Sequence, residues 1–372
     1  MRTVAACSKD VKRLLPDNQS IETIEIDGNE LTFGIVPGRP PEWRRSDPRN
    51  ARRVLVRVRA FSCNYRDKAL FLAAARKGTV NSFYVLGSEF AGEVVDAGDA
   101  VSELKIGDRV IGNNHFVGRS ADRTNLGGIP TNHSSKEYQV FDETKLIRIP
   151  SELTYSMAAA FSIGSQTAYS MIRKLNLTPG SNVLVTAARS NTSLFVISAL
   201  KKHDVNVYAA TTSLEFEKRF KDLGIREVIR ANTGLEGGHQ TLEGVANTLG
   251  GFDCVVDPFY DLYFERAIRL MACGGRYVTC GLAEQGIGRG AVSKNAPVLR
   301  DALLYALVEN IQIIGNCLGL TADLKDAIED YCSGLYPVML DSVFRGNQVG
   351  AFFDRTFSSK ARFGKVVFEY DA

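Results

Sequence analysis

Cysteine pairs, long apolar runs and a strong charge of either sign are all missing from this 372-residue sequence. The seven cysteines are scattered and none forms a Cys-x-x-Cys pair, which argues against a disulfide framework or a zinc ribbon and fits a reducing compartment. The N-terminus is charged early, and no apolar run is long enough to span a bilayer. A net charge of +3 does not indicate a nucleic-acid binder. We therefore expect a cytoplasmic protein with no membrane and no nucleic acid among its partners.

The length predicts about two domains. Residues 1–150 are rich in strand patterns, because residues 53–59 alternate basic and apolar side chains with the period of two that marks a half-buried strand. Short strands with tight glycine turns are expected at 87–98 and 106–112. Residues 113–135 are polar and glycine-rich, and we expect a long loop over a cleft there.

From about Ser156 the pattern changes to strands that alternate with helices. Strands are expected at 183–185, 205–210, 228–229, 252–257, 276–280 and 311–314, and helices at 193–202, 214–223 and 262–271. This alternation predicts an α/β fold, a parallel, doubly wound Rossmann sheet with helices on both faces. Residues 337–370 return to short strands and turns. We therefore expect a discontinuous catalytic domain, residues 1–155 and 318–372, and a dinucleotide-binding domain, residues 156–317.

The turn at 186–193 lacks glycine, although it follows the first strand of the dinucleotide-binding domain. Ala187, Ser190 and Ser193 stand where such a turn has the glycines that let its backbone approach a pyrophosphate. In one interpretation, hydroxyl groups of the turn donate to phosphate oxygens and Arg189 adds charge. In the other, the turn only caps a helix, because Ser, Thr and Asn are ordinary N-caps. The candidate cofactor residues of this turn are Ala187, Arg189, Ser190, Asn191, Thr192 and Ser193.

The end of the second strand indicates which nicotinamide cofactor is preferred. An NAD site needs an acidic residue there to hold the ribose hydroxyls. This chain has Thr212 and Ser213 instead, with Lys218 and Arg219 about one helical turn further on. Hydroxyls and cations suit a 2′-phosphate, which favours NADPH over NADH. The alternative is that the two cations are only the solvent face of a helix.

Six motifs occur in the order typical of one known superfamily. They are Asn-Tyr-Arg-Asp at 64–67, Gly-Ser-Glu at 87–89, Gly-Asp-Arg-Val at 107–110, Gln-Thr-Ala-Tyr at 166–169, Gly-Gly-Arg at 274–276 and Arg-Phe-Gly-Lys-Val-Val at 362–367. Over nearly the whole chain they resemble the medium-chain dehydrogenase/reductase superfamily, and most closely its zinc-independent branch of quinone oxidoreductases and enoyl reductases. The resemblance implies a β-rich GroES-like catalytic domain beside the Rossmann domain.

The zinc-dependent branch of that superfamily binds its catalytic metal through two cysteines and a histidine. Motif alignment puts Asn64, Ser88 and Ile163 at those positions, and none of them is a good Zn²⁺ ligand. Cys63 is next to the first position, but a slip of one residue would break the spacing to Asp67. The Cys-rich lobe for structural zinc is missing as well. We therefore expect no metal site.

The resemblance also assigns candidate roles to the residues of the 64–67 motif. Asn64 is the candidate for orienting the nicotinamide or the substrate carbonyl. Tyr65 and Arg66 could supply a proton or stabilise negative charge, and Tyr65 is the better acid because arginine stays charged. The structural alternative is that Arg66 braces the site by pairing with Asp67 or Glu89.

Two further residues are implied at the cofactor by the same resemblance. Thr167 is expected near the nicotinamide, and Lys365 either near the phosphates or in a stabilising role between the domains. A homodimer is implied, joined through the edge strand at 311–314.

Together these features predict an NADPH-dependent, zinc-independent reductase that delivers hydride to an activated C=C or a quinone. A narrower version is a tailoring enzyme for a small, carrier-bound or peptide-bound alkene, such as a polyketide enoyl group or a dehydroamino acid. The loop at 113–135 and the first 49 residues motivate it, because both could shape a particular pocket. The rival is a non-catalytic binding or structural member, because a Cβ in the cofactor turn can clash with the pyrophosphate.

Overall fold

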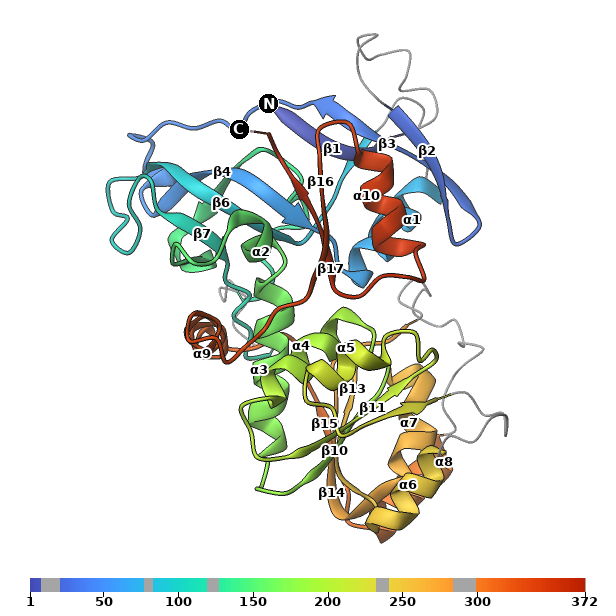
Figure 1. Ribbon diagram of the computed structural model, residues 1–372. Helices are drawn as coiled ribbons and strands as arrows, with labels where there is room; N and C mark the ends of the chain where they lie inside the picture. The colour runs from blue at the N-terminus through green and yellow to red at the C-terminus, as the bar shows by residue number, and fades with distance from the viewer. Residues whose placement is uncertain (8–20, 77–82, 119–126, 232–240, 284–298, 372) are drawn as a thin grey trace. The chain divides into compact units, whose positions relative to one another are not determined.

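The computed structural model describes residues 1–7, 21–76, 83–118, 127–231, 241–283 and 299–371. They form two compact units: unit 1 is Met1–Ile163 with Leu340–Ala372, and unit 2 is Gly164–Met339. The beginning and the end of the chain meet in unit 1, where Arg2 Nη2 donates to Asp371 O at 2.9 Å (Figure 1). Residues 8–20 and 119–126, which belong to the N-terminal stretch and the 113–135 loop, lie outside the described residues.

Unit 1 is built on two sheets. The larger has the order β16–β17–β4–β6–β7–β9, with β8 paired to β4, and the smaller has the order β2–β3–β1–β5. Strands of the larger sheet are β4 Arg53–Ser62, β6 Glu89–Ala97, β7 Arg109–Gly112, β8 Tyr138–Asp142, β9 Leu146–Arg148, β16 Leu340–Arg345 and β17 Lys365–Glu369. Those of the smaller sheet are β1 Arg2–Cys7, β2 Ile21–Ile26, β3 Asn29–Pro37 and β5 Phe83–Val85. The helices are α1 Tyr65–Arg76, α2 Tyr155–Ala159 and α10 Val349–Phe357, with short 3-10 turns at Pro48–Asn50 and Glu143–Lys145.

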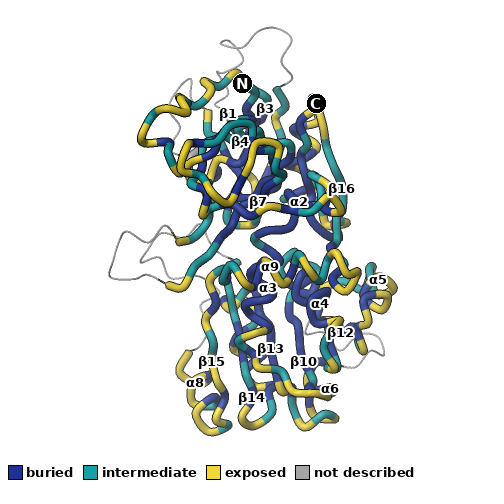
Figure 2. Tube along the Cα trace, turned by 90° about the vertical axis from the view of Figure 1, so that its left-hand side faces the viewer, coloured by how far each residue is buried: buried dark blue, intermediate teal, exposed yellow. Residues whose placement is uncertain are grey.

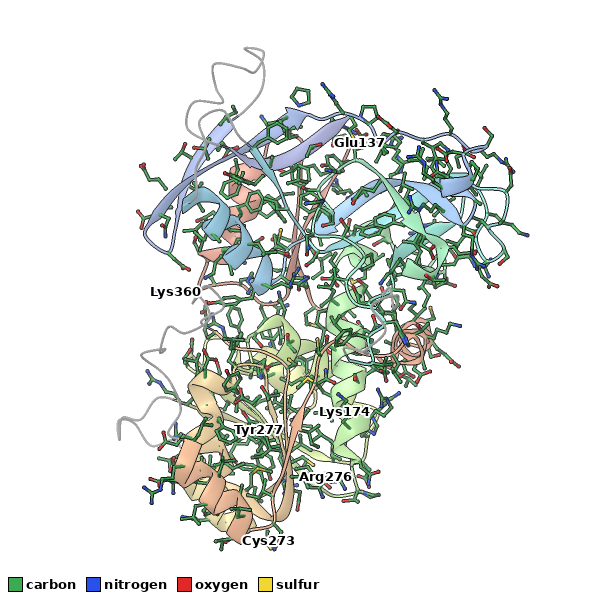
Figure 3. The ribbon with its side chains drawn as sticks, turned by 180° about the vertical axis from the view of Figure 1, so that it is seen from behind. Glu137, Lys174, Cys273, Arg276, Tyr277 and Lys360 are labelled. Atoms are coloured by element: carbon green, nitrogen blue, oxygen red, sulfur yellow. The ribbon has the colours of Figure 1, made fainter. Side chains whose placement is uncertain are left out.

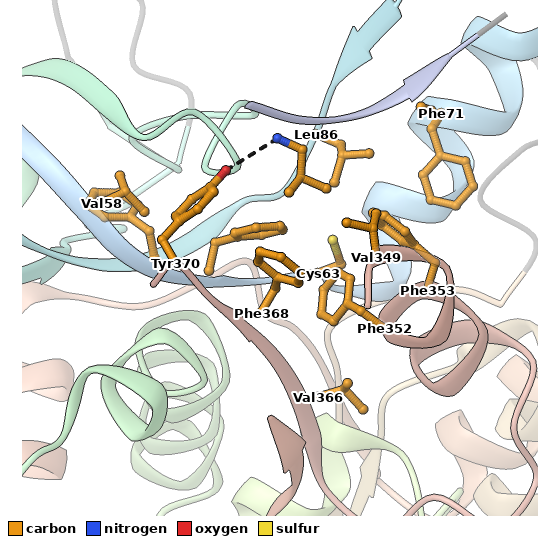
Figure 4. Close-up of a cluster of buried hydrophobic side chains, with 14 of the residues drawn as sticks. Val58, Cys63, Phe71, Leu86, Val349, Phe352, Phe353, Val366, Phe368 and Tyr370 are labelled. Atoms are coloured by element: carbon orange, nitrogen blue, oxygen red, sulfur yellow. Dashed lines mark hydrogen bonds between the residues drawn. The ribbon is translucent and has the colours of Figure 1, made fainter. Parts of the chain in front are cut away.

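The core of unit 1 is aromatic, and α10 supplies much of it. Phe352 and Phe353 are fully buried, and Phe353 stacks on Phe33 of β3 with ring centroids 4.0 Å apart. Cys63 lies among these rings (Figure 4). We predicted only strands and turns for residues 337–370, so α10 corrects that expectation. This nine-residue helix forms because its apolar residues 349, 352 and 353 recur at helical spacing and face the core.

Unit 2 contains the parallel sheet that the sequence predicts. Its order is β12–β11–β10–β13–β14–β15, and every strand pair in it is parallel. This is the doubly wound order in which the chain reverses direction across the sheet beside the first strand, β10. The strands are β10 Asn182–Val185, β11 Asn206–Thr211, β12 Glu227–Arg230, β13 Phe252–Asp257, β14 Met271–Thr279 and β15 Gln312–Gly315.

Helices accompany this sheet, and most residues of its central strands β10 and β13 are buried (Figure 2). The helices are α4 Asn191–Leu200, α5 Glu217–Asp222, α6 Leu242–Leu249, α7 Tyr260–Ile268, α8 Leu299–Val308 and α9 Thr321–Cys332, while α3 Ser162–Leu175 leads into the unit. Helix α5 begins three residues after the start of the helix predicted at 214–223. Within the described residues, no helix is long and apolar enough to cross a membrane.

The division of the chain differs from the boundaries that we expected at 155/156 and 317/318. Helix α9, which we had assigned to the catalytic domain, packs on α3 in unit 2. Arg173 Nε donates to Asp323 Oδ1 at 2.8 Å, and Tyr169 Oη donates to Asp330 Oδ2 at 2.6 Å. These partly buried polar contacts hold α9 against α3 in unit 2. The chain returns to unit 1 only at β16.

Candidate functional site

The motif at 64–67 lies at the start of α1, and its spacing is explained by helix capping. Asp67 Oδ2 accepts from the backbone N–H of Asn64 at 2.7 Å, which is the reciprocal bond of a capping box. The same oxygen accepts from Ser88 Oγ at 2.7 Å. Burial raises the pKa of Asp67 although these hydrogen bonds and the Arg66 guanidinium oppose the shift. The carboxyl group therefore fixes where the helix begins and where Ser88 points.

A buried ion pair lies beside this helix start. Lys365 at the start of β17 and Glu89 at the start of β6 are each 1% exposed, and Lys365 Nζ lies 2.7 Å from Glu89 Oε2. Both strands flank β4, with Glu89 opposite Ser62 in the register, so the sheet itself brings the two charges together. Glu89 Oε1 also accepts from the backbone N–H of Ile163 at 2.6 Å. The pair thus has the additional hydrogen bonds that a buried charge requires.

The side chain of Asn64 is held by this ion pair. Its Oδ1 accepts from Lys365 Nζ at 2.9 Å, and its Nδ2 donates to Glu89 Oε2 at 2.9 Å and to Ser88 Oγ at 3.2 Å. The ammonium can only donate, so the amide must turn its oxygen toward Lys365. These bonds use both Nδ2 hydrogens and leave one lone pair on Oδ1. The amide can therefore accept one further hydrogen bond, but it has no proton left to donate to a substrate carbonyl.

We name Asn64, Asp67, Ser88, Glu89 and Lys365 the Asn64 cluster. Lys365, which we expected at the phosphates or between the domains, is bound inside the cluster and donates also to Cys63 O at 3.2 Å.

Cys63 itself is buried in the aromatic core, and burial raises the pKa of its thiol well above the usual value. Such a thiol is a poor thiolate donor for a metal. Among the described residues, no group of three His, Cys, Asp or Glu side chains could hold a metal ion.

Tyr65 and Arg66 differ in their surroundings. Arg66 Nη1 donates to Asn132 Oδ1 at 2.8 Å and lies 3.4 Å from Asp67 Oδ1, an arrangement that matches the bracing role given as the structural alternative. Tyr65 is 42% exposed, and Lys68 lies beside its ring. Tyr65 is thus the residue of the motif whose side chain is best placed to meet a ligand from solvent.

The cofactor turn in unit 2 keeps the backbone path of a glycine turn. Ala187 has φ +42°, in the left-handed region where glycine is usual. Ser190 is the N-cap of α4, and its hydroxyl accepts from Ser193 N at 3.2 Å. Ser193 is fully buried, and its hydroxyl donates to Thr186 O at 2.7 Å. The Ser193 hydroxyl therefore holds the turn together and does not face a ligand.

A second group of predicted cofactor residues lies near the end of β11. Arg189 and Arg219 both lie over the ring of Phe216, with guanidinium carbons 5.2 and 6.0 Å from its centroid. Thr212, Lys218 and Arg219 are exposed there. Glu215, which sequence reasoning missed, lies 4.0 Å from Arg189 Nη1 and is the nearby carboxylate that could serve a ribose instead. The turn and the end of β11 thus bring together the guanidinium groups of Arg189 and Arg219 and the carboxylate of Glu215.

A buried network under the turn was also missed. Asp257, the last residue of β13, accepts from Thr186 Oγ1 at 2.8 Å and from Tyr277 Oη at 2.5 Å. Tyr277 lies in β14, in the sheet of unit 2 (Figure 3). Burial raises the pKa of Asp257, and it raises that of Tyr277. The sequence signal was an aspartate directly after the apolar residues 254–256 of this strand. The network ties the first residue of the turn to two neighbouring strands.

Thr167 lies in α3 and is 6% exposed. The neighbouring Gln166 donates from Nε2 to Leu320 O at 2.9 Å, so this part of the Gln-Thr-Ala-Tyr motif anchors the start of α9. Asn191 and Thr192 form the first turn of α4 and are partly exposed.

Comparison with known proteins agrees with this arrangement. Residues 50–151 match the family described as alcohol dehydrogenase GroES-like domain. Among solved structures, an NAD-dependent alcohol dehydrogenase is similar with a TM-score of 0.73 over 99% of both chains at 24% identity. A mycobacterial quinone oxidoreductase is similar with a TM-score of 0.69 over 91% of this chain and 95% of that chain at 17% identity. These likenesses show the fold, a Rossmann unit and a GroES-like unit.

Relatives in sequence include polyketide synthases and quinone oxidoreductase-like proteins. This chain is 28% identical to polyketide synthase GfsB of Streptomyces halstedii over 62% of its own length, but it spans only 4% of that protein. It spans 11% of a mycocerosic acid synthase-like polyketide synthase of Mycobacterium tuberculosis at 27% identity. Quinone oxidoreductase-like protein 2 of Rattus norvegicus is 31% identical over 76% of this chain and 75% of that protein. With the GroES-like match and the ordered motifs, this shows that the chain belongs to the medium-chain dehydrogenase/reductase superfamily of oxidoreductases.

Proposed function

We propose that this chain is a zinc-independent reductase that uses NADPH to reduce an activated C=C, of enone, enoyl or dehydroamino acid type, or a quinone. The Asn64 cluster carries the proposal. Asn64 and Ser88 occupy positions that motif alignment gives to zinc ligands, and their polar atoms are bound to Lys365, Glu89 and Asp67. A cation arriving there would have to displace a buried ammonium. The names of the relatives, quinone oxidoreductase-like proteins and polyketide synthases, support this range of substrates.

NADPH fits the residues of unit 2. The glycine-like backbone at Ala187 and the N-terminus of α4 suit the pyrophosphate, and the guanidinium groups of Arg189 and Arg219 suit the 2′-phosphate. Bound there, the dihydronicotinamide would supply the hydride for the reduction.

The residues of unit 1 would bind and protonate the acceptor. Reduction of an α,β-unsaturated carbonyl develops an enolate that needs hydrogen-bond donors and then a proton. Tyr65 donates that proton, and Arg66 contributes positive charge. Asn64 accepts a hydrogen bond through the remaining lone pair of Oδ1, which suits an amide N–H of the nicotinamide and not a carbonyl oxygen.

The proposed partners are an alkene substrate, small or bound to a carrier or peptide, and a second copy of the chain. In unit 2 the edge strand β15 exposes 43% of Ile313, and the neighbouring helix α8 exposes Leu303 and Leu307. Among the strands that the structure describes, β15 is the last of its sheet, and an edge with apolar side chains is suited to pairing with itself about a two-fold axis. Light scattering of the wild type and of Ile313→Lys tests this homodimer, which the variant should weaken.

The test of the function is a fluorescence titration of metal-free protein with NADPH and NADH, followed by NADPH oxidation with a panel of enones and quinones. Saturable NADPH binding with weaker NADH binding, and turnover that a chelator leaves unchanged, is the expected result. Tighter binding of NADH than of NADPH would instead indicate that the Glu215 carboxylate binds the ribose hydroxyls. Chelator-sensitive alcohol oxidation would contradict the proposal.

The second candidate is a non-catalytic family member, and the packed turn favours it. Ala187 adds a Cβ at a positive φ, and the Ser190 and Ser193 side chains are engaged inside the turn. No binding of either nucleotide would support this candidate.

A further inference from the structure

A hairpin near the start of the chain contacts the helix that carries Tyr65. Strands β2 and β3 are joined by Asp27 and Gly28, whose φ angles are +50° and +72°, as a two-residue type I′ turn requires. Aspartate tolerates this conformation. The turn directs the Asp27 carboxylate to α1, where Oδ2 accepts from Lys68 Nζ at 2.6 Å.

Lys68 connects this hairpin with the candidate acid. Its side chain is 10% exposed, and its Nζ lies 3.4 Å from Tyr65 Oη and 4.5 Å from the centroid of the Tyr65 ring. The carboxylate of Asp27 is 54% exposed. Lys68 Nζ therefore contacts both the Asp27 carboxylate and the Tyr65 hydroxyl.

We propose that Lys68 is a positioning residue for Tyr65 and that Asp27 fixes Lys68 in place. The inference rests on the proposed function, in which Tyr65 is the acid. As the acceptor carbon takes the proton, the Tyr65 O–H bond breaks and its electron pair stays on the phenolate, which the Lys68 ammonium stabilises. The phenolate then takes a proton from Lys68, and the amine recovers one from water at the exposed Asp27 carboxylate. Hydride and proton together account for the two hydrogens that the alkene gains.

Asp27 lies outside residues 50–151, the part that matches the GroES-like family, so the family match does not include the contact between Asp27 and Lys68. If Lys68 and Asp27 only fastened the hairpin to α1, their loss would lower stability and leave the chemical step unchanged. The two roles therefore predict different kinetics.

The experiment compares Lys68→Met, Lys68→Arg and Asp27→Asn in the full chain. Asparagine also tolerates the positive φ, so Asp27→Asn keeps the turn and removes the charge. The matched control is Lys202→Met, because Lys202 in unit 2 likewise pairs with an aspartate, Asp330, and lies 4.8 Å from the centroid of a tyrosine ring, Tyr169. Measured quantities are kcat, KM for NADPH, the solvent deuterium isotope effect on kcat and the melting temperature.

Lys68→Met should lower kcat about tenfold or more, within the range of general acid catalysis, and raise the isotope effect while KM for NADPH stays unchanged. Lys68→Arg should restore most of kcat, Asp27→Asn should show a smaller loss of the same kind, and Lys202→Met should show none. An active wild type with an unchanged kcat in folded Lys68→Met and Asp27→Asn would overturn the inference alone. A wild type that neither binds NADPH nor turns over any acceptor would instead overturn the proposed function.

Discussion

Replacing Lys365 by methionine would test the buried pair at the centre of the Asn64 cluster. The change leaves the Glu89 carboxylate, 1% exposed, without its counter-charge. Removing one partner of a buried ion pair costs about 3–5 kcal/mol. Glu89 keeps hydrogen bonds from Ile163 N at 2.6 Å and from Asn64 Nδ2 at 2.9 Å, so we expect the lower end of that range, about 3 kcal/mol.

Unfolding in urea can be followed in unit 1 alone, because the single tryptophan, Trp43, lies there and its Nε1 donates to Asp96 at 2.7 Å. The double variant Lys365→Met/Glu89→Gln should lose less free energy of unfolding than the sum of the single losses. Arg345→Met is the control, since its ion pair with Glu369 is half exposed and worth less than about 1 kcal/mol. A loss below about 1 kcal/mol in Lys365→Met, or strict additivity in the double variant, would refute the reasoning.

Three further changes give separate checks. Arg49→Ala should raise the pKa of Asp47 from about 2 toward 3.8, because the hydrogen bond from the guanidinium is lost while the one from the backbone stays. In the wild type, the small stabilisation from the ionised Asp47 is present above pH 3.8 and is lost as the pH falls toward 2. An NMR titration of the Asp47 carboxyl in the two proteins measures the change in pKa. Ala187→Gly should raise the free energy of unfolding by up to about 1 kcal/mol in circular dichroism, by relieving the positive φ. Alkylation of the native protein at neutral pH should label exposed Cys273 well before Cys63, whose thiol pKa is raised by burial, and mass spectrometry would reveal the order.

The strands of unit 2 could be predicted because buried parallel strands are continuous apolar runs. The run at 252–257 has the same bounds as β13. Helix α10 was missed although its core residues recur at helical spacing, because the stretch around it is short and broken by turns. The motif at 64–67 could be located from sequence, but its contacts could not. Lys365 and Glu89 are 276 residues apart, and only the sheet register brings them together.

The contacts of the 64–67 motif separate its four residues into three that are bound within unit 1 and one, Tyr65, that is half exposed. Asn64, Arg66 and Asp67 are each hydrogen-bonded to side chains or backbone of unit 1, and together they fix the start of α1 and the position of Ser88. Tyr65 is the half-exposed member of the motif. Changes at the other three positions should therefore lower the free energy of unfolding, in addition to removing the roles proposed for Asn64 and Arg66. Tyr65→Phe should lower turnover and leave stability nearly unchanged. Under the proposed function, the other residues of the motif hold the Tyr65 phenol in a fixed position, and the side chains around that phenol would select the acceptor.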